Sequence, residues 1–300
     1  MATVTPLDEG GATTDPIRRV AFAKVNVFLR VLAAREDGYH DLESLVVPIS
    51  LADEVTVRAG ESLRVEVRGA PELEGDASAG GLNLALVAAL TLADACPDAG
   101  GALVEIDKRI PVAAGLGGGS ADAAATLSAL NELWGCGLDP ATLLEVGGRI
   151  GSDVPAMLVG GPVLMSGRGE LLAPAEVASF WWVVVHLDFG VRSPDAYRWW
   201  DEEGDKPGPD PQPLLDTAAA GDAEALGPML FNDLEQPVLR RHPEIGRAKA
   251  RLLGQGALGA VMSGSGSSIA GLARDRAHAE ELAGVFERAV VASGPPSREG

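Results

Sequence analysis

A cluster of glycines between an apolar segment and an alanine-rich segment constrains this chain more than any other feature. The stretch IPVAAGLGGGSADAA occupies residues 110–124, and its glycines are Gly115, Gly117, Gly118 and Gly119. Consecutive glycines let backbone N–H groups converge on one point, and a helix that starts at Ser120 would add its partial positive charge there. The pattern therefore favours a phosphate site. The alternative is a flexible turn in which Ser120 only caps the helix.

The glycine segment matches neither of two common nucleotide-binding motifs. No Lys-Ser or Lys-Thr pair follows the glycines, as a Walker A loop requires, and Ser120 stands where G-x-G-x-x-G needs its third glycine. A dinucleotide-dependent dehydrogenase would also need an acidic residue at the end of a strand about 20 residues further on, and residues 135–138 supply none.

The order of the predicted elements favours an α+β fold. Three hundred residues, 46% of them hydrophobic, are enough for one large or two medium domains. Alternating patterns predict four early strands: Arg19–Val31, Asp41–Pro48, Glu54–Arg58 and Leu63–Arg68. Further strands are expected over Gly101–Ile110, Pro162–Ser166, Trp181–Leu187, Ala257–Ser263 and Ser268–Ala273. Helices are expected over Leu82–Ala95, Ser120–Trp134, Pro140–Ile150, His242–Leu253 and Asp275–Arg288.

Strands followed by mixed helices and strands indicate two α+β halves rather than a doubly wound parallel sheet. We place the boundary near Ala173, which gives an N-terminal domain over 17–173 and a C-terminal domain over 174–295. Residues 1–16 are polar and rich in Gly and Thr, and we expect them to be a disordered lead-in.

Charge and cysteine content restrict the partners. The formal net charge of −19 and the absence of a basic stripe argue against nucleic acid as a partner. No apolar run approaches the length of a membrane span, so no membrane association is expected. Cys96 and Cys136 lack metal-ligand spacing, and we expect them to form no disulfide, which fits a reducing, cytoplasmic location.

The segment AFAKVNVFL, residues 21–29, is the second candidate for chemistry. Period-two alternation predicts that Phe22, Lys24, Asn26 and Phe28 share one face of a strand. A lysine and an asparagine between two aromatic residues are unusual on a solvated face. The alternative is a solvated lysine on an edge strand.

Three shorter motifs each have a structural explanation as well as a functional one. Tyr39 and His40 follow the Asp37-Gly38 turn, where a hairpin would end. Asp153, in IGSDVP, would be an ordinary helix N-cap. The turn SGSGSS, residues 263–268, could be a plain hairpin loop.

Taken together and in order, these motifs resemble the GHMP kinases, small-molecule kinases that hold ATP on a glycine-rich loop ahead of a helix. The matching stretches are AFAKVNVFL, DGYHDLESL, IPVAAGLGGGSADAA, IGSDVP, FNDLE (residues 231–235) and SGSGSS. The resemblance implies two α+β domains, an S5-like N-terminal one and a ferredoxin-like C-terminal one, with the substrate between them. The match is closest to the branch that phosphorylates a cytidine-diphosphate-linked alcohol of the non-mevalonate isoprenoid pathway.

The resemblance also implies roles for individual residues. Asp153 would be the general base, and Lys24 would keep it ionised and stabilise the transferring phosphoryl group. The ATP-binding residues would be Pro111, Ala113, Ala114, Gly115, Leu116, Gly117, Gly118, Gly119 and Ser120. The substrate-binding residues would be Asn26, Tyr39, His40, Tyr197, Gly264, Ser265 and Gly266. Tyr39 and Tyr197 would cover the two faces of the cytosine, and the Ser120 hydroxyl could reach Mg²⁺.

The sequence departs from the family pattern at two positions. Ala121 replaces a second serine of the glycine loop, and Arg192 replaces the serine of a G-V-S segment, which loosens the register around Tyr197. Whether Arg168 or Arg192 contacts phosphate stays open. The alternatives are another GHMP kinase, whose substrate has no base to stack on Tyr39, and a regulatory nucleotide-binding protein, which would be expected to lose Lys24 or Asp153.

Overall fold

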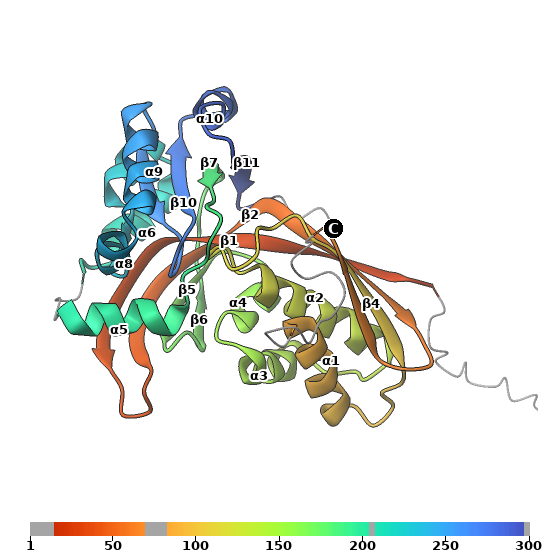
Figure 1. Ribbon diagram of the computed structural model, residues 1–300. Helices are drawn as coiled ribbons and strands as arrows, with labels where there is room; N and C mark the ends of the chain where they lie inside the picture. Colours follow the sequence, from red (N-terminus) through yellow and green to blue (C-terminus); the bar gives the residue numbers. More distant parts are fainter. Residues whose placement is uncertain (1–14, 70–82, 204–207, 297–300) are drawn as a thin grey trace, which may run out of the picture.

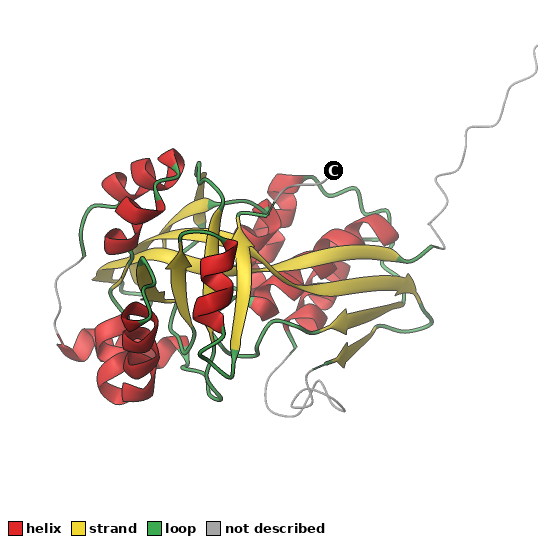
Figure 2. Cartoon of the chain, turned by 90° about the horizontal axis from the view of Figure 1, so that it is seen from above, coloured by secondary structure: helices red, strands yellow, loops and turns green. Residues whose placement is uncertain are grey.

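Two long antiparallel strands, β1 (Ile17–Ala34) and β2 (His40–Ala59), run the length of the molecule and form the centre of its larger sheet (Figure 1; Figure 2). The computed structural model describes residues 15–69, 83–203 and 208–296, so nearly all of the predicted lead-in lies outside the described residues. The sheet has the order β3-β4-β2-β1-β8, and a β5–β6 hairpin pairs with the first part of β2. Its other strands are β3 (Arg64–Arg68), β4 (Ala102–Asp107), β5 (Val163–Gly167), β6 (Leu171–Pro174) and β8 (Phe231–Asn232).

Four helices of the N-terminal half pack beneath this sheet in Figure 1: α1 (Leu84–Ala95), α2 (Gly118–Leu133), α3 (Pro140–Ile150) and α4 (Val154–Val159). The side chain of Asn83 caps α1, and that of Asp139 caps α3, with Pro140 in the first turn. Helix α2 differs, because it starts after Gly117 in a left-handed conformation and no side chain caps it. Its N-terminal N–H groups are therefore left for another partner.

A second, four-stranded antiparallel sheet forms the upper left of Figure 1, with the order β11-β7-β10-β9. Its strands are β7 (Phe180–Val185), β9 (Gly259–Met262), β10 (Ile269–Ala273) and β11 (Ala289–Gly294). The remaining helices are α5 (Ser193–Glu203), α6 (Gln212–Ala220), α7 (Ala223–Leu226), α8 (Glu235–Arg241), α9 (Pro243–Gly254) and α10 (Arg276–Ala283), with a 3₁₀ turn, η1 (Gly227–Met229). The α+β architecture is confirmed.

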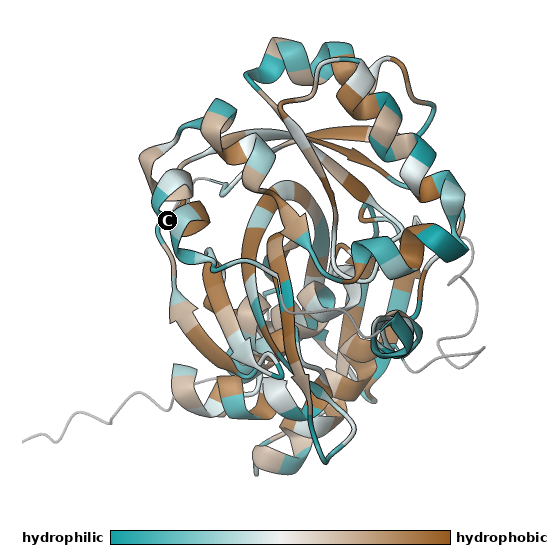
Figure 3. Ribbon diagram, turned by 90° about the vertical axis from the view of Figure 1, so that its left-hand side faces the viewer, coloured by the Kyte–Doolittle hydropathy of each residue, from teal (hydrophilic) through white to brown (hydrophobic). Residues whose placement is uncertain are grey.

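The two sheets share a hydrophobic core. One buried cluster contains Val25, Leu45 and Ile49 from the long strands together with Trp182 and Leu272 from the second sheet. Strands are predominantly apolar, whereas the outer helices carry many hydrophilic residues (Figure 3). The chain passes from the first sheet to the second between β6 and β7. We therefore retain the domain boundary near Ala173 as a proposal.

Several element predictions are wrong in detail. The two strands predicted within residues 41–58 form one strand, β2, because it pairs with β5 along its first part and with β4 along its last. The predicted helix Asp275–Arg288 ends at Ala283, and β11 follows it. Helices α5 to α8 and strands β6, β8 and β11 were not predicted.

The face assignment within β1 is correct for Lys24 and Asn26 but wrong for Phe28. Phe28 is buried in the shared core beside Val27. The β1–β2 register shifts between Asn26 and Phe28, and such a bulge interrupts the strict alternation of faces.

The prediction that the cysteines form no disulfide is also wrong. Cys96 and Cys136 are bonded, with 5.3 Å between their Cα atoms. Cys96 follows the end of α1, and Cys136 lies just beyond the end of α2. These helices pack side by side in the same direction, so their ends meet although the cysteines are 40 residues apart in sequence. The expected reducing location was inferred from unpaired cysteines, and the disulfide removes that support.

Within the described part of the chain, no helix is both long and apolar enough to cross a membrane.

Candidate active site

A bulge in β1 places Lys24 at the centre of the molecule. The pairing of β1 with β2 shifts between Phe22 and Lys24, and Lys24 then lies opposite Pro48. Its backbone N–H donates to the carbonyl of Leu116 in the glycine loop, at 2.9 Å. The lysine is 3% exposed, so it is not the solvated lysine of an edge strand.

The Lys24 ammonium lies among three oxygen atoms. Its Nζ donates to Asn26 Oδ1 at 2.5 Å and to the carbonyl of Gly115 at 2.9 Å, and it lies 3.8 Å from Asp153 Oδ2. Burial lowers the pKa of Lys24, and the neighbouring Asp153 carboxylate raises it in opposition. The ammonium therefore depends on Asp153 and on its hydrogen bonds to stay charged in a dry site.

Asp153 occupies the N-cap position of α4, but its side chain makes no capping hydrogen bond. The carboxylate is 39% exposed and lines the cleft described below. An ordinary N-cap would hold its carboxylate against the helix. This one is left free to accept a proton from a bound molecule while Lys24 lies beside it.

Asn26 is held from both ends of its amide. Its Oδ1 accepts from Lys24, and its Nδ2 donates to Ser44 Oγ at 2.8 Å, which in turn donates to the carbonyl of Phe28. With both ends engaged, the side chain fixes the position of the Lys24 ammonium. Ser44 lies in the DGYHDLESL stretch, but its contact with Asn26 was not predicted.

The glycine loop approaches the lysine closely. A Cβ added to Gly117, which has φ +70°, would lie 3.0 Å from Lys24 Cγ, and one added to Gly115 would lie 2.2 Å from the carbonyl oxygen of Ser263. Larger residues would displace the lysine or the SGSGSS turn. Glycine is therefore required here for close packing as well as for backbone conformation.

A buried ionic cluster, which the sequence did not indicate, supports the same loop. Lys108 Nζ contacts Asp53 Oδ2 at 2.6 Å and Asp122 Oδ2 at 2.7 Å, and Asp53 Oδ1 accepts from the backbone of Arg109 and Ile110. One ammonium thus faces two carboxylates. Burial raises the pKa of Asp122 to about 7, against the opposing effect of Lys108.

Tyr39, His40 and Tyr197 line the same cleft at its other end. The rings of His40 and Tyr197 stack at 4.9 Å, and His40 Nε2 lies 2.8 Å from Asp201 Oδ1. Tyr39 is 51% exposed, with the Arg168 guanidinium 5.2 Å from its ring centre. Burial raises the pKa of Tyr197, so its phenol stays neutral.

The SGSGSS turn closes one wall, and the FNDLE segment holds it there. Asn232 Nδ2 donates to the carbonyls of Met262 and Gly264, both at 2.7 Å. A Cβ on Gly264 would lie 3.1 Å from Lys24 Nζ, so the turn packs on the lysine. Gly264 and Ser265 line the cleft, whereas the α-carbon of Gly266 faces Met262 behind the turn.

One continuous cleft of about 1270 Å³ joins these parts. Every residue named above as a candidate ligand lines it, apart from Gly266. The volume is enough for two small-molecule ligands side by side. The arrangement places a free carboxylate and a buried ammonium beside an uncapped helix N-terminus, which suits phosphoryl transfer to a hydroxyl.

Comparisons with known proteins agree with this chemistry. The family model "GHMP kinases N terminal domain" matches residues 83–161, and the model "GHMP kinases C terminal" matches residues 214–292. A 4-diphosphocytidyl-2-C-methyl-D-erythritol kinase of Symbiobacterium thermophilum is 44% identical over 85% of this chain and 89% of its own length. The enzyme of that name from Streptomyces coelicolor is also 44% identical, over 88% of this chain and 90% of its own.

Solved structures of kinases also match this chain. A crystal structure of 4-(cytidine 5'-diphospho)-2C-methyl-D-erythritol kinase matches with a TM-score of 0.78 and 36% identity, over 94% of this chain and all of that one. A homoserine kinase from Cytophaga hutchinsonii matches with a TM-score of 0.65 at 20% identity, over 97% of this chain and 96% of its own, and so shows the fold alone. On the matched domains and the extent of these identities, the chain belongs to the GHMP kinases.

Proposed function

We propose that this protein phosphorylates the 2-hydroxyl of 4-diphosphocytidyl-2-C-methyl-D-erythritol with ATP, in the non-mevalonate isoprenoid pathway. The observation that carries the proposal is the Lys24–Asp153 pair, 3.8 Å apart in a cleft that also contains the Tyr39–His40 end. Relatives of that activity match over most of both chains. We also propose a cytoplasmic location, which the use of ATP supports.

The uncapped start of α2 fits the phosphates of ATP. Gly118, Gly119 and Ser120 present the first-turn N–H groups of the helix to the cleft, and no protein side chain caps them. When bound, ATP supplies the phosphoryl group, and Mg²⁺ would neutralise its charge. Among the described residues no three His, Cys, Asp or Glu side chains cluster as metal ligands. Mg²⁺ commonly needs only one or two protein ligands beside phosphate oxygens, and we propose Ser120, which lines the cleft, as one of them.

Asp153 accepts the proton of the substrate hydroxyl in this proposal. Its carboxylate is free of capping bonds and lies 3.8 Å from the ammonium of Lys24. Lys24 in turn presents a positive charge that the hydrogen bonds to Asn26 and Gly115 hold in place before substrate binds. The pair therefore supplies both a proton acceptor and charge stabilisation without forming a covalent intermediate.

His40 supports cytosine as the base. With its proton on Nε2, the imidazole donates to Asp201 and leaves Nδ1 as an acceptor for the amino group of cytosine. Uracil presents an oxygen at that position, so a fixed acceptor would face another acceptor. We propose that the base stacks on the exposed ring of Tyr39. The resemblance implied that Tyr197 covers the other face of the base, but its ring stacks on His40, and we propose instead that it orients the imidazole.

A coupled ADP-release assay with ATP and Mg²⁺ tests the activity. We expect turnover of 4-diphosphocytidyl-2-C-methyl-D-erythritol and none of mevalonate or homoserine. Competition with CDP and UDP tests the base, and we expect CDP to bind roughly 100-fold more tightly, since each unpaired buried polar group costs about 1–3 kcal/mol. Turnover of mevalonate or homoserine instead would replace the proposed substrate, and equal inhibition by CDP and UDP would remove the cytidyl specificity.

A further inference from the structure

Among the described residues, two arginines that line the cleft form no ion pair. Five basic side chains line it: Lys24, Lys108, Arg168, Arg192 and Arg198. Lys24 and Lys108 have the carboxylate partners described above, and Arg198 pairs with Asp195 and Glu202. Over the described ranges, no carboxylate lies within ion-pair distance of Arg168 or Arg192. Arg168 and Arg192 are therefore the two positive charges in the lining of this cleft that form no ion pair with a described carboxylate.

Arg168 lies at the end of the cleft where the base is proposed to bind. It follows β5, and its guanidinium is 5.2 Å from the centre of the Tyr39 ring. The nearby carboxylate of Asp37 is already paired with Arg35. The guanidinium of Arg168 therefore has donors available for a further acceptor.

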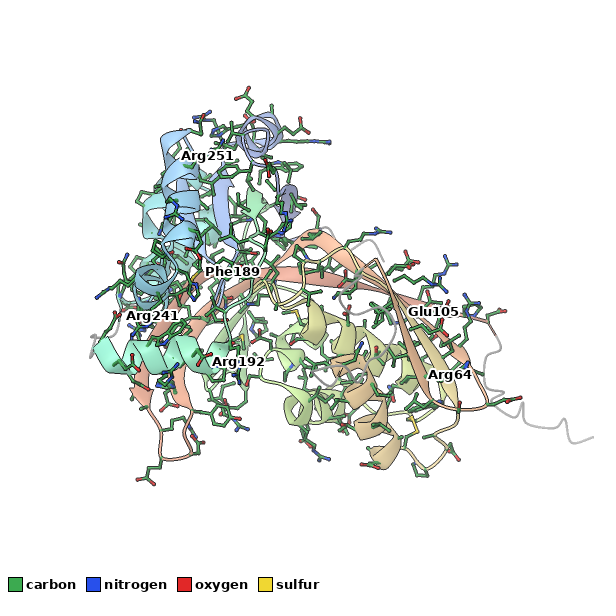
Figure 4. All side chains as sticks on the ribbon, viewed as in Figure 1. Arg64, Glu105, Phe189, Arg192, Arg241 and Arg251 are labelled. Carbon is green, nitrogen blue, oxygen red and sulfur yellow. A yellow bond between two sulfur atoms is a disulfide. The ribbon has the colours of Figure 1, made fainter. Side chains whose placement is uncertain are left out.

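Arg192 lines the same cleft at the start of α5. It directly precedes α5, at the end of the helix that faces the middle of the molecule (Figure 4). The next residue, Ser193, is hydrogen-bonded through its Oγ to Ser265 Oγ at 3.2 Å. Ser265 adjoins Gly264, which packs on the Lys24 ammonium. Arg168 thus lies at the aromatic end of the cleft, and Arg192 adjoins the turn that packs on Lys24.

We propose that Arg168 and Arg192 form an anion site that binds the diphosphate of the acceptor substrate. This inference rests on the proposed function, because a nucleoside-diphosphate-linked alcohol carries its diphosphate between its base and its hydroxyl. A guanidinium donates two parallel hydrogen bonds to phosphate oxygens, which neutral side chains cannot do. Arg192 occupies a position where the family pattern has serine. This arginine is therefore a feature of this chain and not of the family pattern.

Calorimetric titration of the full-length protein with CDP, UDP and cytidine tests the site. The variants are Arg168→Gln and Arg192→Ser, with Arg198→Gln as the matched control, because Arg198 lines the same cleft but has two carboxylate partners. We expect each of the first two variants to weaken CDP binding about 5- to 30-fold, as for a partly exposed charge-assisted hydrogen bond. Cytidine binding and the KM for ATP should not change, and Arg198→Gln should bind CDP as the wild type does.

The outcomes separate this proposal from the proposed function. Unchanged CDP affinity in both variants would overturn the anion site and leave the kinase assignment intact. A raised KM for ATP with unchanged CDP binding would also overturn it, by assigning the arginines to the nucleotide donor. Equal binding of CDP and UDP, both weakened in the variants, would confirm the anion site and refute the choice of cytosine. Arg192→Lys keeps the positive charge but loses the pair of parallel N–H donors, so its affinity for CDP should lie between those of the wild type and Arg192→Ser. Melting temperatures equal to that of the wild type would exclude misfolding of the variants.

Discussion

Asp153 and Lys24 have different roles in the proposed phosphoryl transfer. Asp153 accepts the proton, and Lys24 provides a fixed positive charge. Replacement of Asp153 by Asn keeps the shape but removes the acceptor, so we expect kcat to fall roughly 10² to 10⁴-fold. ATP affinity should change little, because the carboxylate does not contact the start of α2. Steady-state kinetics with a separate ATP-binding titration measure both quantities.

Lys24→Ala provides the companion measurement. We expect a loss on the order of 10²-fold or more, and a double variant no worse than the poorer single one, because the two groups act as a unit. Activity of Asp153→Asn within about threefold of wild type would instead return Asp153 to a capping role. Losses that multiply in the double variant would show that the residues act independently.

Asp122 makes the stability of the protein depend on pH. Its pKa is about 7 in the folded protein, above the ordinary 3.8, because burial disfavours its charge. Folding therefore takes up a proton between these values, and the free energy of unfolding falls as pH rises from about 4 through 7. We expect urea unfolding curves to give a lower stability at pH 8 than at pH 5. Asp122→Asn should reduce this difference, whereas Asp139→Asn, at an exposed helix cap, should leave it unchanged.

The proposed site residues could be named from the sequence because they lie in short motifs that resemble those of a known family. The residue pattern alone left a structural alternative for Lys24, Asp153 and the glycine segment, and the resemblance to the GHMP kinases supplied their roles. Residues that act through long-range contacts were not predictable. Asp53 is 55 positions from Lys108, and Asn232 acts on a turn 30 positions away, so no local pattern marks either of them.

At the scale of elements, the disulfide between the ends of α1 and α2 should stabilise the half that holds the glycine loop. A bond closing 40 residues contributes about 4 kcal/mol by the loop-entropy relation. We expect dithiothreitol to lower the urea midpoint of the wild type and to have no effect on a Cys96→Ser/Cys136→Ser variant. Identical midpoints for wild type with and without reductant would show that the bond does not persist in solution.

Helix and strand prediction succeeded where the hydrophobic period was clear, as in α3, whose bounds match the prediction. It failed for α5, which is mostly polar and directly precedes the sequence GDKPGPDPQP, residues 204–213. Tyr197 was nevertheless assigned to the substrate end through the family pattern, and the structure places it against His40. Stacking between rings on separate elements leaves no trace in local periodicity.

At the scale of the whole molecule, the shared core predicts that the two halves unfold together. Trp182 and Leu272 of the second sheet pack in the same cluster as Val25 and Ile49 of the first. A chain ending at Ala173 would expose that face of β1 and β2 to water. We expect one calorimetric transition for the intact protein, no cooperative melting for residues 15–173, and recovery of folding when 15–176 and 177–296 are co-expressed. Two separate transitions would show independent domains.

The long β1–β2 pair also limits how genes of this family can be recombined. A chimera joined near Ala173 would combine the C-terminal sheet of one parent with the strands of another, although both surfaces belong to one core. Crossover points that keep residues 23–49 with the parent supplying 180–292 preserve those contacts. A functional exchange of halves between relatives therefore requires transferring two discontinuous segments of sequence as one block.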